Sequence, residues 1–271
     1  MSRHTVTLTR AADVASVRAA LASLPESTRI VDGPTADIHV LSGAAEDWPT
    51  AVTEAESAGA IALLVVDPPS SLEGIDELLR VHERLPVALH LPWSGNPALA
   101  GREQDASRCG ALRLVVASGA VPADGYGDEA LTRGAADLVI ALSQVAARPV
   151  DVCRVHRTTW TLAVSGTIEQ APVSVIVART DAPDRYTGEL GVHGETGALT
   201  ALIPGVSSAT PACLRISDDD GELQWPTRYE TALRSSLRGI IAALADSDWP
   251  SDVARYGSVL TAFAVAGDSA R

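Results

Sequence analysis

The sequence predicts an α/β fold in two parts: a doubly wound parallel sheet, then an α+β domain with a mostly antiparallel open sheet. Strand-like and helix-like patterns alternate over residues 1–118, as they do in parallel sheets covered by helices on both faces. From about Gly119 the pattern changes, and strand-like runs follow one another with short turns between them. Two helical patterns close the chain. We therefore predict one domain at residues 1–118 and a second at 119–271.

Apolar or alternating runs in the first half predict its strands. Thr5–Thr9 alternates and is rich in β-branched residues, whereas Ala60–Val66 is apolar throughout. The predicted strands are Thr5–Thr9, Thr28–Val31, Asp37–Leu41, Ala60–Val66, the centre of Leu85–Ser94, and Ala111–Ala117.

Helical patterns fill the intervals between these strands. The first helix has an apolar stripe at the spacing of one helix face, made by Val14, Val17, Leu21 and Leu24. Pro49 lies near the first turn of a helix predicted at Asp47–Ser57. Ser70 and Glu73 make a capping-box pattern for the next helix, and a further one is predicted near Pro97–Arg108.

The second half begins with a loop-like segment at Val121–Glu129 and a helix from about Asp128 to Val145. Turns such as Gly194–Gly197 and Asp218–Gly221 then separate strand-like runs, which is typical of antiparallel sheets. The runs are Val150–His156, Thr159–Ile168, Val173–Arg179, Glu189–His193, Ala198–Ile203 and Cys213–Ile216. The closing helices are predicted near Arg228–Ala245 and Ser251–Gly267.

The stretch Leu85–Ser94 (LPVALHLPWS) marks the expected mouth of the parallel sheet. Open α/β sheets bind ligands at the carboxyl ends of their strands, where His90–Trp93 would lie. His90 is the titratable group best placed there, although a histidine in an apolar run is also commonly a satisfied core residue. His39, on the third strand, could face the same crevice.

Composition excludes several classes of partner and chemistry. The net charge is −13, the pI is near 4.8, and no basic cluster exceeds two adjacent residues. A nucleic acid or an anionic membrane surface is therefore not an expected partner. All 21 basic residues are arginine, which excludes Schiff-base chemistry and a P-loop lysine.

The cysteines and the apolar runs indicate a soluble, cytoplasmic protein. Cys109, Cys153 and Cys213 are far apart, so we expect buried free thiols rather than disulfides or a zinc site. The six histidines show no metal-binding spacing, and no metal is expected. The N-terminus lacks the apolar core of a signal peptide, and Ala60–Val66 is far shorter than the ~20 residues of a membrane helix.

The order of these motifs resembles the Gfo/Idh/MocA oxidoreductases, the family of glucose–fructose oxidoreductase and inositol dehydrogenase. VVDPPS (Val65–Ser70) is similar to the family's proline turn at the cofactor, and LPVALHLPW falls at its glutamate-lysine-proline motif. Gly134–Val152 and Gly191–Leu199 are similar to its helix–strand and strand–turn segments, and the closing helices match its C-terminal pattern. The chain resembles a degenerate, shortened member, trimmed around Gly119–Asp128.

The resemblance implies a Rossmann-like NAD(P)-binding domain, a C-terminal α+β domain whose open sheet mediates oligomerisation, and oxidoreduction of a sugar or polyol. It would place a set of residues at the cofactor: Thr9, Arg10, Asp32, Asp67, Pro68, His90 and Pro92. Thr9–Val14 contains none of the glycines that let a backbone approach a pyrophosphate. Asp32 either binds a ribose or is a turn residue, and Arg10 either meets an anion or is solvated.

The resemblance places no proton-transfer group at the family's catalytic positions. The family's lysine falls on Leu91. Its histidine, three residues before Asp137, falls on Gly134, and its acid falls on Ala130. None of these side chains can transfer a proton. We therefore expect no catalytic residue, with His90 as the remaining candidate, and no cofactor; NAD or NADP would bind if the family function is retained.

These expectations define a leading function and two alternatives. The leading one is a homologue that has lost NAD(P)-dependent catalysis and acts as a binding or assembly subunit. It would self-associate, or join an active paralogue, through the C-terminal sheet. One alternative is an atypical NAD(P)-dependent oxidoreductase for a sugar or polyol, with His90 as proton donor and Asp32 on the ribose. The other is a sensor that binds a small molecule such as a sugar or polyol.

Overall fold

The chain forms two compact units. The computed structural model describes residues 3–12, 14–102, 105–123, 127–182, 187–205, 211–246 and 252–268. The first unit comprises Met1–Leu91 and Thr231–Gly257, and the second comprises Pro92–Glu230 and Ser258–Arg271. This division differs from the predicted boundary between residues 118 and 119. One predicted strand belongs to the other sheet, and one predicted helix returns to the first unit.

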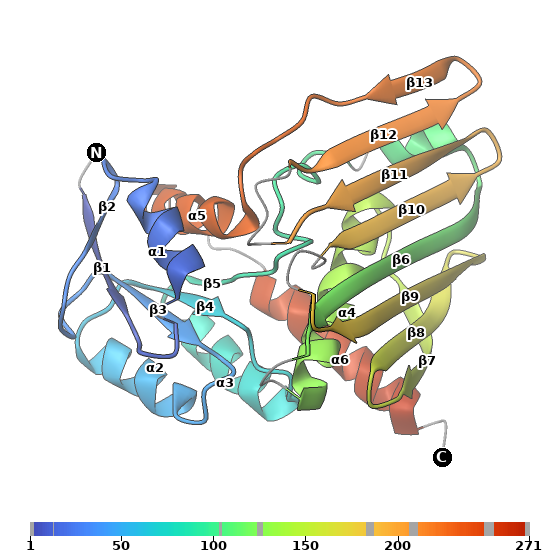
Figure 1. Cartoon of the computed structure of the whole chain (residues 1–271). Helices are drawn as coiled ribbons and strands as arrows, with labels where there is room; N and C mark the ends of the chain where they lie inside the picture. The colour runs from blue at the N-terminus through green and yellow to red at the C-terminus, as the bar shows by residue number, and fades with distance from the viewer. Residues whose placement is uncertain are drawn as a thin grey trace. The chain divides into compact units, whose positions relative to one another are not determined.

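The first unit contains a five-stranded, entirely parallel sheet in the order β2-β1-β3-β4-β5 (Figure 1). Its strands are β1 (His4–Leu8), β2 (Thr28–Ile30), β3 (Ile38–Ser42), β4 (Ala62–Val66) and β5 (Val87–Leu89). Every residue of β3, β4 and β5 is buried, as expected for strands covered on both faces. The predicted doubly wound parallel sheet is confirmed.

Among the described residues, the helices that lie wholly in the first unit are α1 (Ala15–Ala22), α2 (Trp48–Ser57), α3 (Leu72–His82) and α5 (Ala232–Asp246). The apolar stripe of α5, represented by Leu237 and Ile240, shares one core cluster with Val40 and Leu64 of the sheet. The first closing helix therefore packs in the first unit, although the sequence placed it with the second domain.

The N-cap of α3 lies one residue after the position that the predicted capping box gave it. Ser71, not Ser70, is the N-cap, and its hydroxyl accepts a hydrogen bond of 3.2 Å from the backbone N–H of Gly74. Glu73 lies in the first turn, where a carboxylate favours the helix dipole.

The described part of the segment predicted as a helix near Pro97–Arg108 contains no α-helix. Turns occupy residues 97–101, and a short 3-10 helix, η1, lies at Asp105–Cys109. Asn96 accepts a hydrogen bond from the backbone N–H of Ala98, and Gly101 has φ +70°, a left-handed conformation that ends a helical path.

The second unit contains an eight-stranded sheet in the order β13-β12-β11-β10-β6-β9-β8-β7 (Figure 1). All neighbouring pairs are antiparallel except β6 and β9. The strands are β6 (Leu112–Pro122), β7 (Asp151–Arg157), β8 (Thr161–Ile168), β9 (Ala171–Thr180), β10 (Gly188–Gly194), β11 (Gly197–Ile203), β12 (Cys213–Asp218) and β13 (Gly221–Gln224). The predicted α+β part with a mostly antiparallel sheet is thus confirmed, but Ala111–Ala117 lies in β6 rather than in the parallel sheet.

One face of this sheet packs on α4 (Gly127–Val145), and the other is open. Buried residues such as Val115 and Ala117 alternate along β6 with more exposed ones such as Val116 and Ser118. The last helix, α6 (Asp252–Asp268), begins in the first unit and ends in the second. Among the described residues, no helix combines the length and apolarity that crossing a bilayer requires.

Candidate functional site

The carboxyl ends of the parallel strands bring four predicted cofactor residues to one edge of the first unit's sheet. Thr9 follows β1, Asp32 lies beyond β2, Asp67 follows β4, and His90 follows β5. Asp32 and His90 belong to opposite ends of this row, four strand spacings or roughly 19 Å apart. These residues therefore lie along one edge of the sheet, but the outermost two are too far apart to contact the same small group of a ligand.

The turn between β1 and α1 does not fit the pyrophosphate of a dinucleotide. The backbone N–H of Ala12 donates to the carbonyl of Thr9 at 3.0 Å, and that of Val14 donates to Ala12 at 2.9 Å. Ala12 is 0% exposed and belongs to the hydrophobic core cluster of this unit, so a residue with a side chain stands where the fingerprint has glycine. Arg10 is exposed on this turn. Two amides that could face a phosphate are thus bonded within the chain.

The turn after β4 packs closely against two glycines, Gly43 and Gly74. Asp67 has φ +46°, and Pro68 and Pro69 behind it are buried. A Cβ atom at Gly43 would lie 2.7 Å from Cδ of Pro69, and one at Gly74 would lie 2.6 Å from its Cβ. The proline ring therefore occupies the space above the carboxyl end of β3, and the chain fills this part of the edge itself.

His90 is a buried, neutral histidine. Its backbone N–H donates to Val65 at 2.8 Å, and its Nδ1 has no hydrogen-bond partner among the described residues. Burial lowers the pKa of His90 to about 4. Near neutral pH only a minute fraction carries the proton that a general acid must supply.

His39 does not join His90 in a shared crevice. The β3–β4–β5 register places His39 on the face of Leu63 and Val87, whereas His90 continues the opposite face, that of Ala88. His39 is buried, and burial lowers its pKa. The two histidines therefore cannot act on one ligand from the same side of the sheet.

In the second unit, the segment after Leu91 is held by a buried carboxylate. Oδ2 of Asp137, on α4, accepts the backbone N–H of Trp93 at 2.8 Å. Its Oδ1 accepts the backbone N–H of Ser94 at 2.8 Å and the Ser94 hydroxyl at 2.5 Å. Pro92 precedes this pair and is half-buried. Asp137 thus fixes a backbone segment, and its oxygens are engaged by these donors.

The two α4 positions to which the resemblance assigned a histidine and an acid do not present side chains to a site. Gly134 faces the sheet, because a Cβ there would lie 2.9 Å from Val121 and 3.1 Å from Val177. Ala130 is a buried apolar residue. The carboxylate that reaches the segment after Leu91 is Asp137, whose role the sequence did not reveal.

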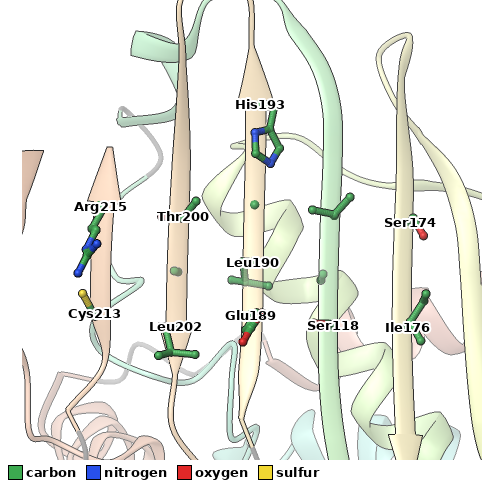
Figure 2. A pocket seen from close by; sticks show the side chains of 14 residues that line it. Ser118, Ser174, Ile176, Glu189, Leu190, His193, Thr200, Leu202, Cys213 and Arg215 are labelled. Atoms are coloured by element: carbon green, nitrogen blue, oxygen red, sulfur yellow. The ribbon is translucent and has the colours of Figure 1, made fainter. Parts of the chain in front are cut away.

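The open face of the second sheet carries a groove of about 670 Å³ (Figure 2). Gly191 is one of its lining residues, and a Cβ there would lie 2.9 Å from Nε2 of His193. Apolar and polar side chains alternate around it, and the principal ones are Val116, Ser118, Ile176, Glu189, Leu202 and Arg215. The volume lies within the range of small-ligand pockets.

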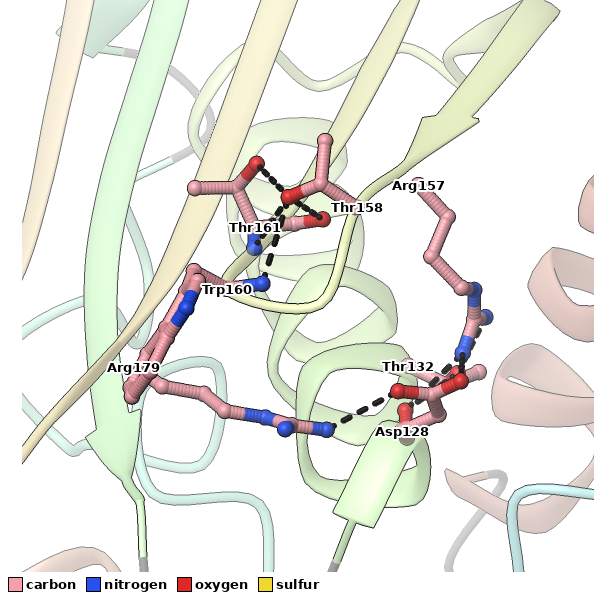
Figure 3. A network of polar contacts seen from close by, with 7 residues as sticks. All are labelled: Asp128, Thr132, Arg157, Thr158, Trp160, Thr161 and Arg179. Atoms are coloured by element: carbon pink, nitrogen blue, oxygen red, sulfur yellow. Dashed lines mark hydrogen bonds and ion pairs between the residues drawn. The ribbon is translucent and has the colours of Figure 1, made fainter.

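A polar network ties the start of α4 to the sheet (Figure 3). Arg179 donates to the carboxylate of Asp128 at 2.9 Å. Arg157 donates to the hydroxyl of Thr132 at 2.7 Å and to the carbonyl of Asp128 at 3.1 Å. Trp160 is 58% exposed beside this network. Because the charged groups pair with one another, the network stabilises the helix–sheet junction.

No group of three or more metal-ligating side chains occurs in the described ranges. The cysteines are free, but the prediction that all are buried is wrong, because Cys153 is exposed and Cys213 is half-buried. Burial raises the pKa of Cys109, which keeps this thiol protonated.

No protein-family model matches the sequence, and a search of curated proteins finds no significant match. Solved structures do match over the full length. KijD10, a 3-ketoreductase from Actinomadura kijaniata crystallised with NADP and TDP-benzene, is 16% identical, with 98% of each chain covered and a TM-score of 0.76. An oxidoreductase from Sinorhizobium meliloti is 11% identical over 100% of this chain and 99% of its own, with a TM-score of 0.74.

UDP-N-acetylglucosamine 3-dehydrogenase GnnA from Acidithiobacillus ferrooxidans is 12% identical over 99% of each chain, with a TM-score of 0.67. At these identities the similarity shows a shared fold. The two-part architecture implied by the sequence resemblance is therefore confirmed as the fold of these oxidoreductases.

Proposed function

We propose that this chain has the fold of NAD(P)-dependent sugar oxidoreductases but has lost hydride transfer, and acts as a binding or assembly subunit. The observation that carries this proposal is Leu91. It stands where the resemblance places the catalytic lysine, is buried at 5% exposure, and has no atom that can donate a proton.

The cofactor edge supports the same proposal. The backbone N–H of Ala12 donates to Thr9 within the turn between β1 and α1, and Pro69 fills the space beside Gly43. A dinucleotide would have to displace these contacts without the glycine turn that normally receives its pyrophosphate. We therefore propose that the chain uses neither NAD nor NADP.

The open sheet face supports an assembly role. Leu114, Ile176 and Leu202 are all exposed apolar residues of this sheet. A second copy of this chain would cover such side chains, since exposed apolar patches commonly mark protein interfaces. We propose self-association through this face; an active paralogue is the other partner that the same surface would accept.

The alternative is an NAD(P)-dependent oxidoreductase for a sugar or polyol. The fold shared with KijD10, a 3-ketoreductase crystallised with NADP, favours it. It requires His90 to donate a proton, whereas burial holds the pKa of His90 at about 4. It also requires Asp32, which is exposed beyond β2, to bind the ribose.

Loss of nicotinamide absorbance measures hydride transfer directly. Purified full chain is incubated with NADH or NADPH and a panel of keto-sugars, free and nucleotide-linked. The proposal predicts no consumption above a blank without protein. Turnover that disappears in His90→Gln would support the alternative. A sugar or polyol that raises Tm without any turnover would support the sensor.

Light scattering tests assembly. The proposal predicts a mass above that of the monomer, which Leu202→Glu on the open face shifts toward the monomer. Ile61→Glu is the matched control, because Ile61 is similarly exposed but lies in the first unit. A monomeric wild-type chain, or equal effects of both substitutions, would contradict assembly through the open face.

A further inference from the structure

Trp93 fills a slot whose walls are glycines. Its side chain is 4% exposed. A Cβ atom at Gly119 would lie 2.6 Å from Cη2 of the indole, and one at Gly188 would lie 2.7 Å from Cδ1. A Cβ atom at Gly134 would lie 3.4 Å from Cζ3. The first two contacts are closer than real Cβ atoms approach, so alanine at either position would displace the ring.

These positions require glycine because the indole leaves no room for a Cβ atom, not because of their backbone conformation. None of the three has a positive φ, so the backbone itself would accept an alanine. Gly119 and Gly188 are directly opposed in the antiparallel pairing of β6 and β10. Two facing glycines weaken a sheet, because they contribute no side-chain packing and lose much conformational entropy on folding. Their joint presence makes an opening in the sheet surface that the indole occupies.

The backbone that carries the indole is fixed independently. Asp137 accepts the N–H groups of Trp93 and Ser94, both at 2.8 Å. This buried carboxylate sets the position of the segment, and the glycine slot receives the ring. Trp93 lies two residues after Leu91, where the resemblance places the lost lysine.

We propose that Trp93 is a resident ligand of the second unit: its indole occupies a slot that accepts a flat aromatic molecule once the side chain is removed. The inference rests on the proposed function in one respect. If hydride transfer is lost, no substrate has to enter beside Leu91, and a side chain of the protein can fill the slot permanently. An apolar cavity of this kind stays dry and binds a small aromatic molecule.

The direct test adds indole to the Trp93→Gly variant of the full chain. We expect Trp93→Gly to lower Tm, and millimolar indole to raise it again by several degrees, with saturable binding by calorimetry. Trp160→Gly is the matched control, because Trp160 is exposed and lies outside the slot. Indole should shift neither this variant nor the wild type. An indole effect absent from Trp93→Gly, or equal in the control, would overturn the proposal.

A second test applies if Trp93→Gly does not fold. Gly188→Ala is made in the wild type and in a Trp93→Leu background. The slot predicts a large loss of Tm in the wild type and a clearly smaller loss beside the shorter leucine. Equal losses in both backgrounds would overturn the proposal. Neither test involves a nicotinamide cofactor, so each outcome is independent of whether hydride transfer is lost.

Discussion

Asp137 holds Ser94 twice, through Oδ1, which accepts the backbone N–H at 2.8 Å and the side-chain hydroxyl at 2.5 Å. The same carboxylate accepts the N–H of Trp93 through its other oxygen. Ser94 and Asp137 are 43 positions apart in the sequence, and their hydrogen bonds join α4 to the segment after Leu91.

Asp137→Ala removes the acceptor for buried donors of Trp93 and Ser94. Buried N–H groups left without partners cost about 1–3 kcal/mol each, so we expect a loss of roughly 2–4 kcal/mol in the free energy of unfolding. Urea denaturation measures it. Glu169→Ala is the control, because its ion pair with Arg148 is exposed and worth under about 1 kcal/mol. Equal effects of the two substitutions would contradict the role of Asp137.

Gly43→Ala tests the close contact with Pro69. A Cβ at Gly43 would lie 2.8 Å from the backbone nitrogen of Pro69 and 2.9 Å from the carbonyl oxygen of Asp67. Because backbone cannot easily move away, we expect a destabilisation of about 1–3 kcal/mol. Gly239→Ala, on α5 with nothing within 4 Å, should instead stabilise by about 0.5–1 kcal/mol. Thermal unfolding that moves in the same direction for both variants would be inconsistent with this packing.

Ser71→Ala should destabilise the protein by about 1 kcal/mol, because the hydroxyl caps the N–H of Gly74. Ser70→Ala is a neighbouring control that leaves the cap intact and should change stability by less than about 0.5 kcal/mol. Chemical denaturation of both variants distinguishes them. A larger loss for Ser70→Ala would favour the capping box predicted from sequence.

His90 makes stability depend on pH. Its pKa falls from 6.5 in the unfolded chain to about 4 in the fold, so the unfolded state binds more protons between these values. The contribution of His90 to the free energy of unfolding is fully present above about pH 6.5. It decreases by about 3 kcal/mol as the pH falls to and below 4. Unfolding measured across this range should show a shallower dependence in His90→Leu. His156→Gln, at an exposed position, is the control, and an unchanged profile in His90→Leu would refute the assignment.

The sequence predicted the elements of the first unit well but misplaced one strand. Ala111–Ala117 looked like a sixth parallel strand because it follows a long alternation of strands and helices. The structure pairs it with β9 and β10 instead. Its buried and exposed residues alternate, whereas β3 and β4 are buried at every position. That burial pattern is typical of a sheet with one open face, and it is seen only in the structure.

The candidate site was only partly predictable. Strand order brings Thr9, Asp32, Asp67 and His90 to one edge, as their positions after predicted strands implied. The bond from Asp137 to Ser94 could not be foreseen, because nothing local joins residues so distant in sequence. An aspartate within the apolar pattern of α4 was the one hint, since a buried carboxylate must be hydrogen-bonded.

We propose that the chain has kept the oxidoreductase fold and lost the ability to bind NAD or NADP. Calorimetric titration of the full chain with NADPH, NADP, NADH and NAD tests it most directly. We expect no saturable heat of binding with any of the four nucleotides up to millimolar concentration. Saturable binding of any of them in the micromolar range would contradict it.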